Sequence, residues 1–150
     1  MFLQKHAIQF HEENIATTYV LVSRSDRPDV YGYITLVSSE IRTNGDAQLT
    51  EIEQADRYDT LPGVKIARLA IHKDCQGNGY GGEMVSFAVA TIATKVMPFV
   101  GCRFVIVDSK PDAVGKYEEW GFTMLDTEEN RFGSHPLLYI DLYRLFQEEG

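Results

Sequence analysis

The apolar residues of this chain recur at two spacings, and the spacing changes from one segment to the next. Segments rich in β-branched, aromatic and other apolar residues, which favour strands, are 17–24, 30–37, 64–71, 102–107, 122–125 and 137–145. Segments whose apolar residues instead recur at about three- and four-residue intervals, which favours helices, are 2–14, 84–97 and 111–120. The alternation of these segments predicts an α/β (α+β) fold.

The order of the segments predicts how the strands pair. The turn cluster at residues 25–29 makes 17–24 and 30–37 an antiparallel hairpin, in which Gly32 predicts a bulge or a close approach of two backbones. A helix separates 64–71 from 102–107, and this order predicts a parallel pair with a right-handed crossover. The last two segments, 122–125 and 137–145, are expected to close the sheet as an antiparallel pair. We therefore expect a mixed, mostly antiparallel sheet with helices on both faces.

The polar stretch 38–63 is the least regular part of the chain. Asn44 to Asp46 is expected to turn, and Pro62-Gly63 is expected to break the backbone before the next strand. Residues 48–58 are acidic and form either a short helix or a mobile loop. They are interpreted either as a solvated loop or as a lid that selects a cationic or amine-bearing molecule.

Length, charge and cysteine content limit the class of protein. A chain of 150 residues is expected to form one domain, residues 1–150. The formal net charge of −8 disfavours broad nucleic-acid binding, which depends on cationic surfaces. Cys75 and Cys102 do not make a disulfide framework, and no apolar run is long enough to span a membrane. We expect a cytoplasmic protein.

The most informative stretch runs from Arg68 to Phe87, where a buried-type strand turns through four glycines into a helix. The first N–H groups of a helix have no partner inside it, and the helix dipole places partial positive charge there. Glycines allow positive φ and remove the Cβ atoms that would keep a ligand away. The stretch predicts a phosphate cradle. It lacks the Gly-Lys-Ser/Thr of a nucleotide P-loop, and no acidic residue follows at the distance that a dinucleotide fold requires.

Two motifs resemble the GCN5-related N-acetyltransferases (GNAT). Gln76-Gly77-Asn78-Gly79-Tyr80-Gly81 is similar to the family's coenzyme A loop, Q/R-x-x-G-x-G/A. Tyr117, Gly121 and Phe122 are similar in order and spacing to the Y-x-x-x-G-F that follows the second parallel strand of the family. With the elements between them, these motifs span about two-fifths of the chain, and on them the chain is identified as a member of the family.

The resemblance implies a site and an activity, namely acetyl-CoA-dependent N-acetyl transfer to a primary amine by direct attack in a ternary complex, without a metal. It implies that two parallel strands splay apart and admit coenzyme A between them. Tyr117 would be the general acid that protonates the leaving thiolate. The residues that would bind coenzyme A are Leu69, Ala70 and Ile71, through their backbone, and Gln76, Gly77, Asn78, Gly79, Tyr80, Gly81 and Gly82, around the pyrophosphate. A general base is not evident, and Glu40 is a candidate.

A narrower resemblance is to the toxin branch of the family, which acetylates aminoacyl-tRNA and pairs with a small DNA-binding antitoxin. It rests on Arg68-Leu69-Ala70 before the loop and on Tyr117. Residue 2 already begins what resembles the second helix of the family, so the first strand is expected to be missing, either from the fold itself or because the sequence starts late. An edge exposed by that loss could be covered by a second subunit in a possible homodimer.

Three functions therefore stay open. The first is an N-acetyltransferase acting on a small-molecule or peptide amine. The second is a toxin-type enzyme acting on aminoacyl-tRNA, the one nucleic acid that we expect as a partner. The third is a non-catalytic acyl-CoA-binding module. A dinucleotide-binding oxidoreductase ranks far below these, and no membrane partner is expected.

Overall fold

The computed structural model describes residues 2–148, apart from the side chain of Asp56. Six strands hydrogen-bond in the order β1-β2-β3-β4-β6-β5. The contacts of the chain group into two compact units, one within Met1–Val37 and Ile66–Thr91 and the other within Ser38–Lys65 and Ile92–Gly150. We call them unit 1 and unit 2, and the long strands β2 and β3 contribute to both.

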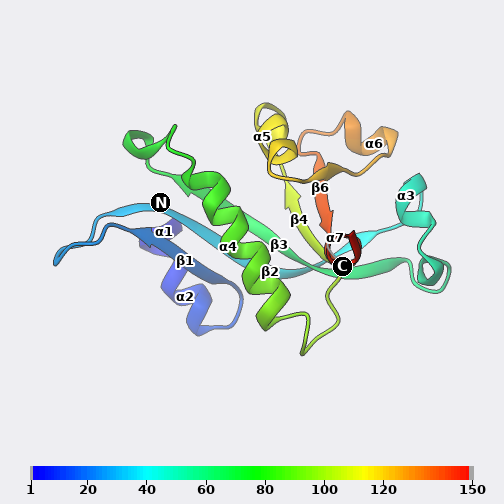
Figure 1. Cartoon of the computed structure of the whole chain (residues 1–150), viewed down its shortest axis with the longest axis horizontal. Coiled ribbons are helices and arrows are strands. Elements are labelled where there is room, and N and C mark those ends of the chain that lie inside the picture. The colour runs from blue at the N-terminus through cyan, green and yellow to red at the C-terminus, as the bar shows by residue number, and fades with distance from the viewer. Residues whose placement is uncertain (1, 149–150) are drawn as a thin grey trace. The chain divides into compact units, whose positions relative to one another are not determined.

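Unit 1 contains the hairpin, the glycine loop and most of the longest helix (Figure 1). Its elements are α1 (Phe2–Lys5), α2 (Ala7–Glu12), β1 (Thr17–Val22), the first part of β2 (Val30–Arg42), the second part of β3 (Thr60–Ile71), η2 (Lys73–Cys75) and most of α4 (Tyr80–Lys95). The pair β1–β2 is antiparallel, as predicted.

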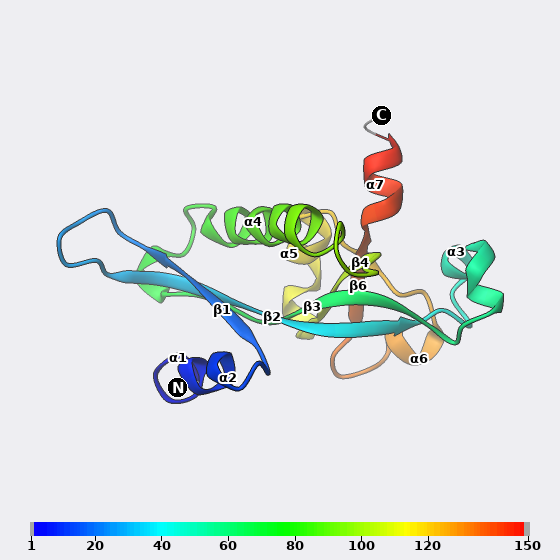
Figure 2. The ribbon, with the colours of Figure 1, turned by 90° about the horizontal axis from the view of Figure 1, so that it is seen from below.

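Helices cover both faces of the strands in unit 1 (Figure 2). Partners across an antiparallel pair point to the same face, and successive residues alternate between faces. Tyr19 lies opposite Ile34, and its ring meets Phe87 of α4 at 5.0 Å. Tyr33 faces the other way and stacks on Phe2 of α1 at 6.3 Å. The α1–α2 pair and α4 therefore lie on opposite faces.

Both features predicted at Gly32, a bulge and a close approach of two backbones, are present. The register of β1 against β2 shifts between Leu21 and Val22, so Tyr31 is the extra residue of a bulge directly beside Gly32. A Cβ on Gly32 would lie 2.7 Å from the carbonyl oxygen of Ala70 in β3. The glycine is required because two backbones approach closely here.

Unit 2 contains the remaining strands and the shorter helices. Its elements are the second part of β2, α3 (Ala47–Thr50), η1 (Glu53–Asp56), the first part of β3, the end of α4, β4 (Phe104–Asp108), η3 (Pro111–Ala113), α5 (Val114–Glu119), β5 (Thr123–Met124), α6 (Glu128–Arg131), β6 (Leu137–Asp141) and α7 (Leu142–Glu148). Antiparallel ladders join β6 to β4 and to β5.

The predicted parallel pair is β3 and β4. The N–H of Arg103 donates to the carbonyl of Pro62, and Lys65 bonds Asp108 further along both strands, so the two strands run in the same direction. The sheet is thus mixed and mostly antiparallel, as the sequence predicts.

The core of unit 2 explains the acidic segment before β3. Leu49 of α3 is fully buried and Ile52 is 6% exposed, and both belong to a cluster of buried side chains. The other buried members of that cluster are Ile41, Leu61, Phe104, Ile106 and Tyr139. Because this apolar side anchors it, the segment is a packed part of unit 2 and not a free lid.

Two sequence predictions are wrong in unit 2. Pro62-Gly63 does not break the backbone but lies inside β3, where Pro62 still accepts a hydrogen bond through its carbonyl. The expected strand 137–145 ends at Asp141, because the Asp141 carboxylate accepts the backbone N–H of Arg144 and caps α7. Leu142 is buried as the first residue of that helix.

No helix within residues 2–148 is both long and apolar enough to cross a membrane. In the same residues, no three His, Cys, Asp or Glu side chains gather as a metal site.

Candidate functional site

The glycine loop leaves β3 at Ile71 and enters α4 at Tyr80 (Figure 1). Gly77 and Gly79 have φ values of +83° and +80°, the left-handed region in which only glycine is unstrained. The helix α4 starts at Tyr80, directly after the second of them. The conformation therefore depends on glycine at these two positions.

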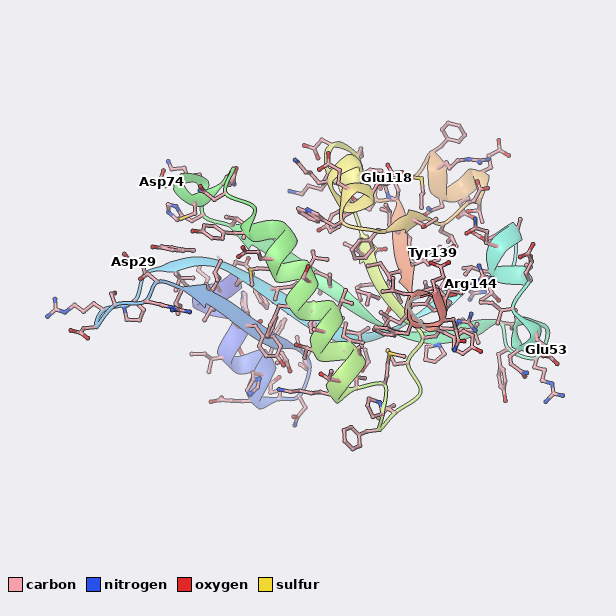
Figure 3. All side chains as sticks on the ribbon, in the orientation of Figure 1. Asp29, Glu53, Asp74, Glu118, Tyr139 and Arg144 are labelled. Carbon is pink, nitrogen blue, oxygen red and sulfur yellow. The ribbon has the colours of Figure 1, made fainter. Side chains whose placement is uncertain are left out.

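Side-chain hydrogen bonds fix the path of this loop. The Gln76 Nε2 donates to the carbonyl of Ile71 at 3.0 Å, and the Asn78 Nδ2 donates to the carbonyl of Cys75 at 2.9 Å. His72 starts η2, its Nδ1 accepting the backbone N–H of Asp74, the acidic residue labelled on this turn in Figure 3. Two of the residues expected to bind coenzyme A, Gln76 and Asn78, therefore use their side chains to stabilise the backbone of the loop.

The start of α4 has the features that a pyrophosphate needs. The first intrahelical bond runs from the N–H of Glu83 to the carbonyl of Gly79 at 3.1 Å. The N–H groups of Tyr80, Gly81 and Gly82 therefore have no carbonyl acceptor within the helix, and they can donate to a ligand. A Cβ on Gly77 or Gly79 would meet nothing within 4 Å, so the space beside the loop is open. These residues fit an anionic ligand held by backbone donors.

Tyr80 packs and is not poised to react. Its ring stacks on Tyr31 of β2, with centroids 5.9 Å apart and planes inclined by 28°. The stack joins the first turn of α4 to the hairpin within unit 1. It supports the loop from the side of the protein.

At the end of β3, the backbone N–H and C=O groups of the three residues expected to bind pantetheine point to different edges of the strand. The N–H of His72 donates to Tyr31 of β2, so the polar groups of Ala70, two residues earlier, also face β2. Leu69 and Ile71 alternate with them and turn their backbone groups to the opposite edge. The carbonyl of Ile71 already accepts the Gln76 side chain, so the backbone groups of Leu69 and the N–H of Ile71 are the better candidates for hydrogen bonds to a ligand.

Tyr117 and its motif form the end of α5 in unit 2. The N–H of Phe122 donates to the carbonyl of Tyr117 at 3.0 Å, and the N–H of Gly121 donates to Glu118 at 3.1 Å. Gly121 has a φ of +98°. These two bonds, with the left-handed residue, make a Schellman motif. The Y-x-x-x-G-F spacing is the spacing of a helix end that fixes the tyrosine backbone.

The phenol of Tyr117 lies among aromatic rings. Trp120 and Phe122 both meet its ring edge to face, with centroids 5.4 Å away in each case. Burial raises the pKa of Tyr117 above its ordinary value of 10.0. Within residues 2–148 its hydroxyl makes no hydrogen bond to the protein. Tyr117 is therefore a neutral phenol at physiological pH, with a proton that it can donate.

Other candidates have structural partners. The Arg68 guanidinium lies 4.1 Å from the centre of the Phe2 ring, so it holds α1 on the sheet by a cation–π contact. The Glu40 carboxylate accepts the hydroxyl of Thr60 at 2.9 Å. Neither contact identifies a general base.

Sequence reasoning missed Trp120. The signal was present, because an aromatic residue three positions after a helical tyrosine lies on the same helix face. It was hidden because the tryptophan occupies one of the undefined positions of the Y-x-x-x-G-F pattern.

Comparison with known proteins identifies the family. Residues 47–136, more than half of the chain, match the family described as an acetyltransferase (GNAT) domain. The chain belongs to the GNAT acetyltransferases. The family assignment made from the two motifs is confirmed, and so is the GNAT fold.

Solved structures of similar fold include KacT and AtaT. A tyrosine-to-phenylalanine mutant of KacT has a TM-score of 0.79 and 28% identity, over 98% of this chain and 83% of that chain. AtaT complexed with acetyl-methionyl-tRNAfMet has a TM-score of 0.82 and 24% identity, over 99% and 84%. AtaTR bound with AcCoA has a TM-score of 0.76 and 24% identity, over 99% and 83%. AtaT is called a toxin in another of its structures, so the likeness to the toxin branch is confirmed for the fold.

Proposed function

We propose that this GNAT protein is an acetyl-CoA-dependent N-acetyltransferase, which moves an acetyl group to a primary amine by direct attack in a ternary complex. The observation that carries the proposal is the state of Tyr117, a partly buried neutral phenol whose backbone is fixed by a Schellman motif. The family supplies the general reaction, acetyl transfer.

The glycine loop is assigned to the binding of acetyl-CoA. Backbone N–H groups from Gly77 to Gly82 would hold the pyrophosphate, with Asn78 and Gln76 keeping the loop in shape. Leu69 and Ile71 would bond the amides of the pantetheine arm, with Ala70 between them in the strand. Bound acetyl-CoA supplies the thioester whose acetyl group is transferred. That AtaTR was solved with AcCoA supports the choice of ligand.

Tyr117 is assigned to the proton transfer. An amine that attacks a thioester must be neutral, and the departing thiolate needs a proton. A phenol whose pKa is raised by burial stays protonated at neutral pH and can donate that proton. The amine can lose its own proton to water if its pKa lies near neutrality, so the reaction needs no dedicated base from the protein.

The acceptor is a small-molecule or peptide amine in this proposal. The second candidate acceptor is aminoacyl-tRNA, which carries a primary α-amine of suitable pKa. It is favoured by AtaT, whose structure contains acetyl-methionyl-tRNAfMet, and a small DNA-binding antitoxin would then be a partner. The net charge of −8 favours the first candidate, because tRNA binding gains from cationic surfaces.

Two further features belong to the proposal. β1 ends the strand order, so its outer edge is available to a second copy in a homodimer. Cys75 and Cys102 are free thiols, which suits the reducing cytoplasm in which we place the activity.

Thiol release from acetyl-CoA tests the proposal. Wild type and Tyr117→Phe are assayed with polyamines, amino acids, aminoglycosides, peptides and charged tRNA as acceptors. Turnover with one class, lost in the variant, identifies the acceptor and supports Tyr117 as the acid. Tight binding of acetyl-CoA with no release from any acceptor would contradict the proposal and favour a non-catalytic acyl-CoA-binding module.

A further inference from the structure

Trp120 contacts the proposed acid, Tyr117, through both its backbone and its side chain. It is the C-cap of α5, with φ −86° and ψ 8°, and its N–H donates to the carbonyls of Lys116 and Tyr117 at 3.1 Å each. Its ring meets the ring of Tyr117 nearly at a right angle, at 87°. The residue is thus attached to Tyr117 both through the backbone and through the ring.

Packing alone sets the direction of the phenol. The Tyr117 hydroxyl has no hydrogen-bond partner within residues 2–148, so no polar contact of the protein there fixes the side-chain torsions. The two ring neighbours differ in what holds them. Phe122 is 4% exposed and belongs to the core, whereas Trp120 is half-buried. Phe122 thus contacts the Tyr117 ring from a buried position, and Trp120 contacts it from a half-buried one.

The Trp120 side chain contacts the proposed acid through its ring and not through a hydrogen bond. The structure gives its indole N–H no hydrogen-bond partner in the described part of the chain, and its one contact with another aromatic ring there is with Tyr117. A large apolar ring that is only half-buried gives up part of the stabilisation that full burial would provide. In its half-buried position the Trp120 ring keeps the edge-to-face contact with Tyr117.

We propose that Trp120 is a positioning residue, which holds the Tyr117 ring in the direction needed for proton donation and keeps water from its hydroxyl. The inference rests on the proposed role of Tyr117 as the acid. No proton passes through the indole. The proton moves from the Tyr117 oxygen to the departing thiolate, and Trp120 acts by fixing the position and hydration of that oxygen.

Two substitutions separate positioning from general packing. Trp120→Ala removes the ring, so the phenol gains rotamers and water, and kcat falls about 10- to 100-fold while the KM for acetyl-CoA stays within about twofold. Trp120→Phe keeps an aromatic edge at the same place and restores most of kcat. Phe87→Ala is the matched control, since it removes a 44% exposed ring in edge-to-face contact with Tyr19 of unit 1. It is expected to keep the wild-type kcat.

The pH profile supplies a readout that a merely structural role would not move. The acid must be protonated, so kcat falls at alkaline pH as Tyr117 ionises. Burial raises the pKa of Tyr117, and exposure in Trp120→Ala lets it return toward about 10, which moves the alkaline fall to lower pH. Trp120→Phe keeps the wild-type profile. An unchanged profile and kcat in Trp120→Ala, or equal losses in both variants, would overturn the inference.

A turnover-independent measurement keeps this test apart from that of the proposed function. The Tyr117 phenol is titrated by NMR with ring-labelled tyrosine, its signal assigned by its loss in Tyr117→Phe. A lower pKa in Trp120→Ala, with wild-type values in Trp120→Phe and Phe87→Ala, supports the control of the phenol by Trp120, and an unchanged pKa overturns it. Full turnover in Tyr117→Phe would instead refute the role of Tyr117 itself.

Discussion

The backbone N–H of Phe122 donates to the carbonyl of Tyr117 at 3.0 Å, while the rings of the two residues meet edge to face. The bond ends α5 and the ring contact closes the helix end, with Gly121 providing the left-handed residue between them. One local structure therefore explains why tyrosine, glycine and phenylalanine occur at this spacing. It also gives the tyrosine a fixed backbone from which to act.

Gly121→Ala is expected to lower both stability and turnover. Alanine at a φ of +98° costs about 1–2 kcal/mol of folding free energy, and relief of that strain would open the helix end that holds Tyr117. Urea denaturation and thiol release measure the two effects.

Gly115→Ala is the control for that change. Gly115 lies within the same helix, and a Cβ there meets nothing within 4 Å. We expect a gain of roughly 0.5–1 kcal/mol, since alanine favours helix over glycine. Equal losses in both variants would show that the helix end has no special role.

Gly79→Ala is expected to weaken acetyl-CoA binding. Gly79 has a φ of +80°, and the space beside it is open to a ligand, so a methyl group there both strains the loop and obstructs an anion. Gly45→Ala carries similar strain at +91° in unit 2. Calorimetric titration with acetyl-CoA should show about a tenfold loss of affinity for Gly79→Ala, about 1.4 kcal/mol, and none for Gly45→Ala. The loop assignment fails if the two variants bind alike.

Gly63→Ala tests the close approach of β3 to β4 at Gly63. Its Cβ would lie 2.7 Å from both the Phe104 carbonyl oxygen and the Ile106 Cδ1, so a backbone would have to move. We expect a loss of about 1–3 kcal/mol in urea denaturation. Gly101→Ala, whose Cβ would come no nearer than 3.9 Å to Pro62, should change stability by less than about 0.5 kcal/mol. A stable Gly63→Ala protein would contradict the described packing.

Tyr139 of β6, labelled in Figure 3 near Arg144, makes the fold sensitive to alkali. Burial, helped by the Asp46 carboxylate, raises the pKa of Tyr139 to about 12. In the unfolded chain the phenol ionises near pH 10, so above that pH the unfolded state binds fewer protons than the folded state. The free energy of unfolding is therefore expected to fall as pH rises from about 10 toward about 12.

Tyr139→Phe isolates this contribution. The variant loses only a long 3.4 Å hydrogen bond to Gln48, and its stability should depend less steeply on alkaline pH than that of wild type. Urea denaturation of both proteins from neutral pH to about pH 11 measures the difference. Parallel curves would mean that Tyr139 ionises alike in the folded and unfolded states.

The glycine loop and the tyrosine motif were predictable because their geometry is local. Glycine is the residue that permits the positive φ found at Gly77 and Gly79, and the apolar spacing that comes after them predicts the helix. Gly32 was predictable for a similar reason, since an isolated glycine in a strand marks a bulge or a close approach. These features need no knowledge of distant contacts.

Features that depend on distant contacts were missed. Pro62-Gly63 resembles a breaker in the sequence, but both residues lie in β3, and position 63 is glycine because Phe104 and Ile106 of β4 leave no room there for a side chain. Residues 142–145 resemble a continuation of the strand because they include two leucines and a tyrosine and directly follow β6. The overlooked local signal was Asp141, which caps α7 while its carboxylate also binds Arg103.

The most direct test of the account measures acetyl-CoA affinity and turnover together on Tyr117→Phe. The substitution removes one hydroxyl that bonds nothing in the described residues, so the fold and the affinity for acetyl-CoA, within about twofold, are expected to persist while kcat falls about 100- to 10,000-fold. A variant that binds acetyl-CoA normally and has lost turnover confirms Tyr117 as the acid. A variant that keeps full turnover would contradict the central claim.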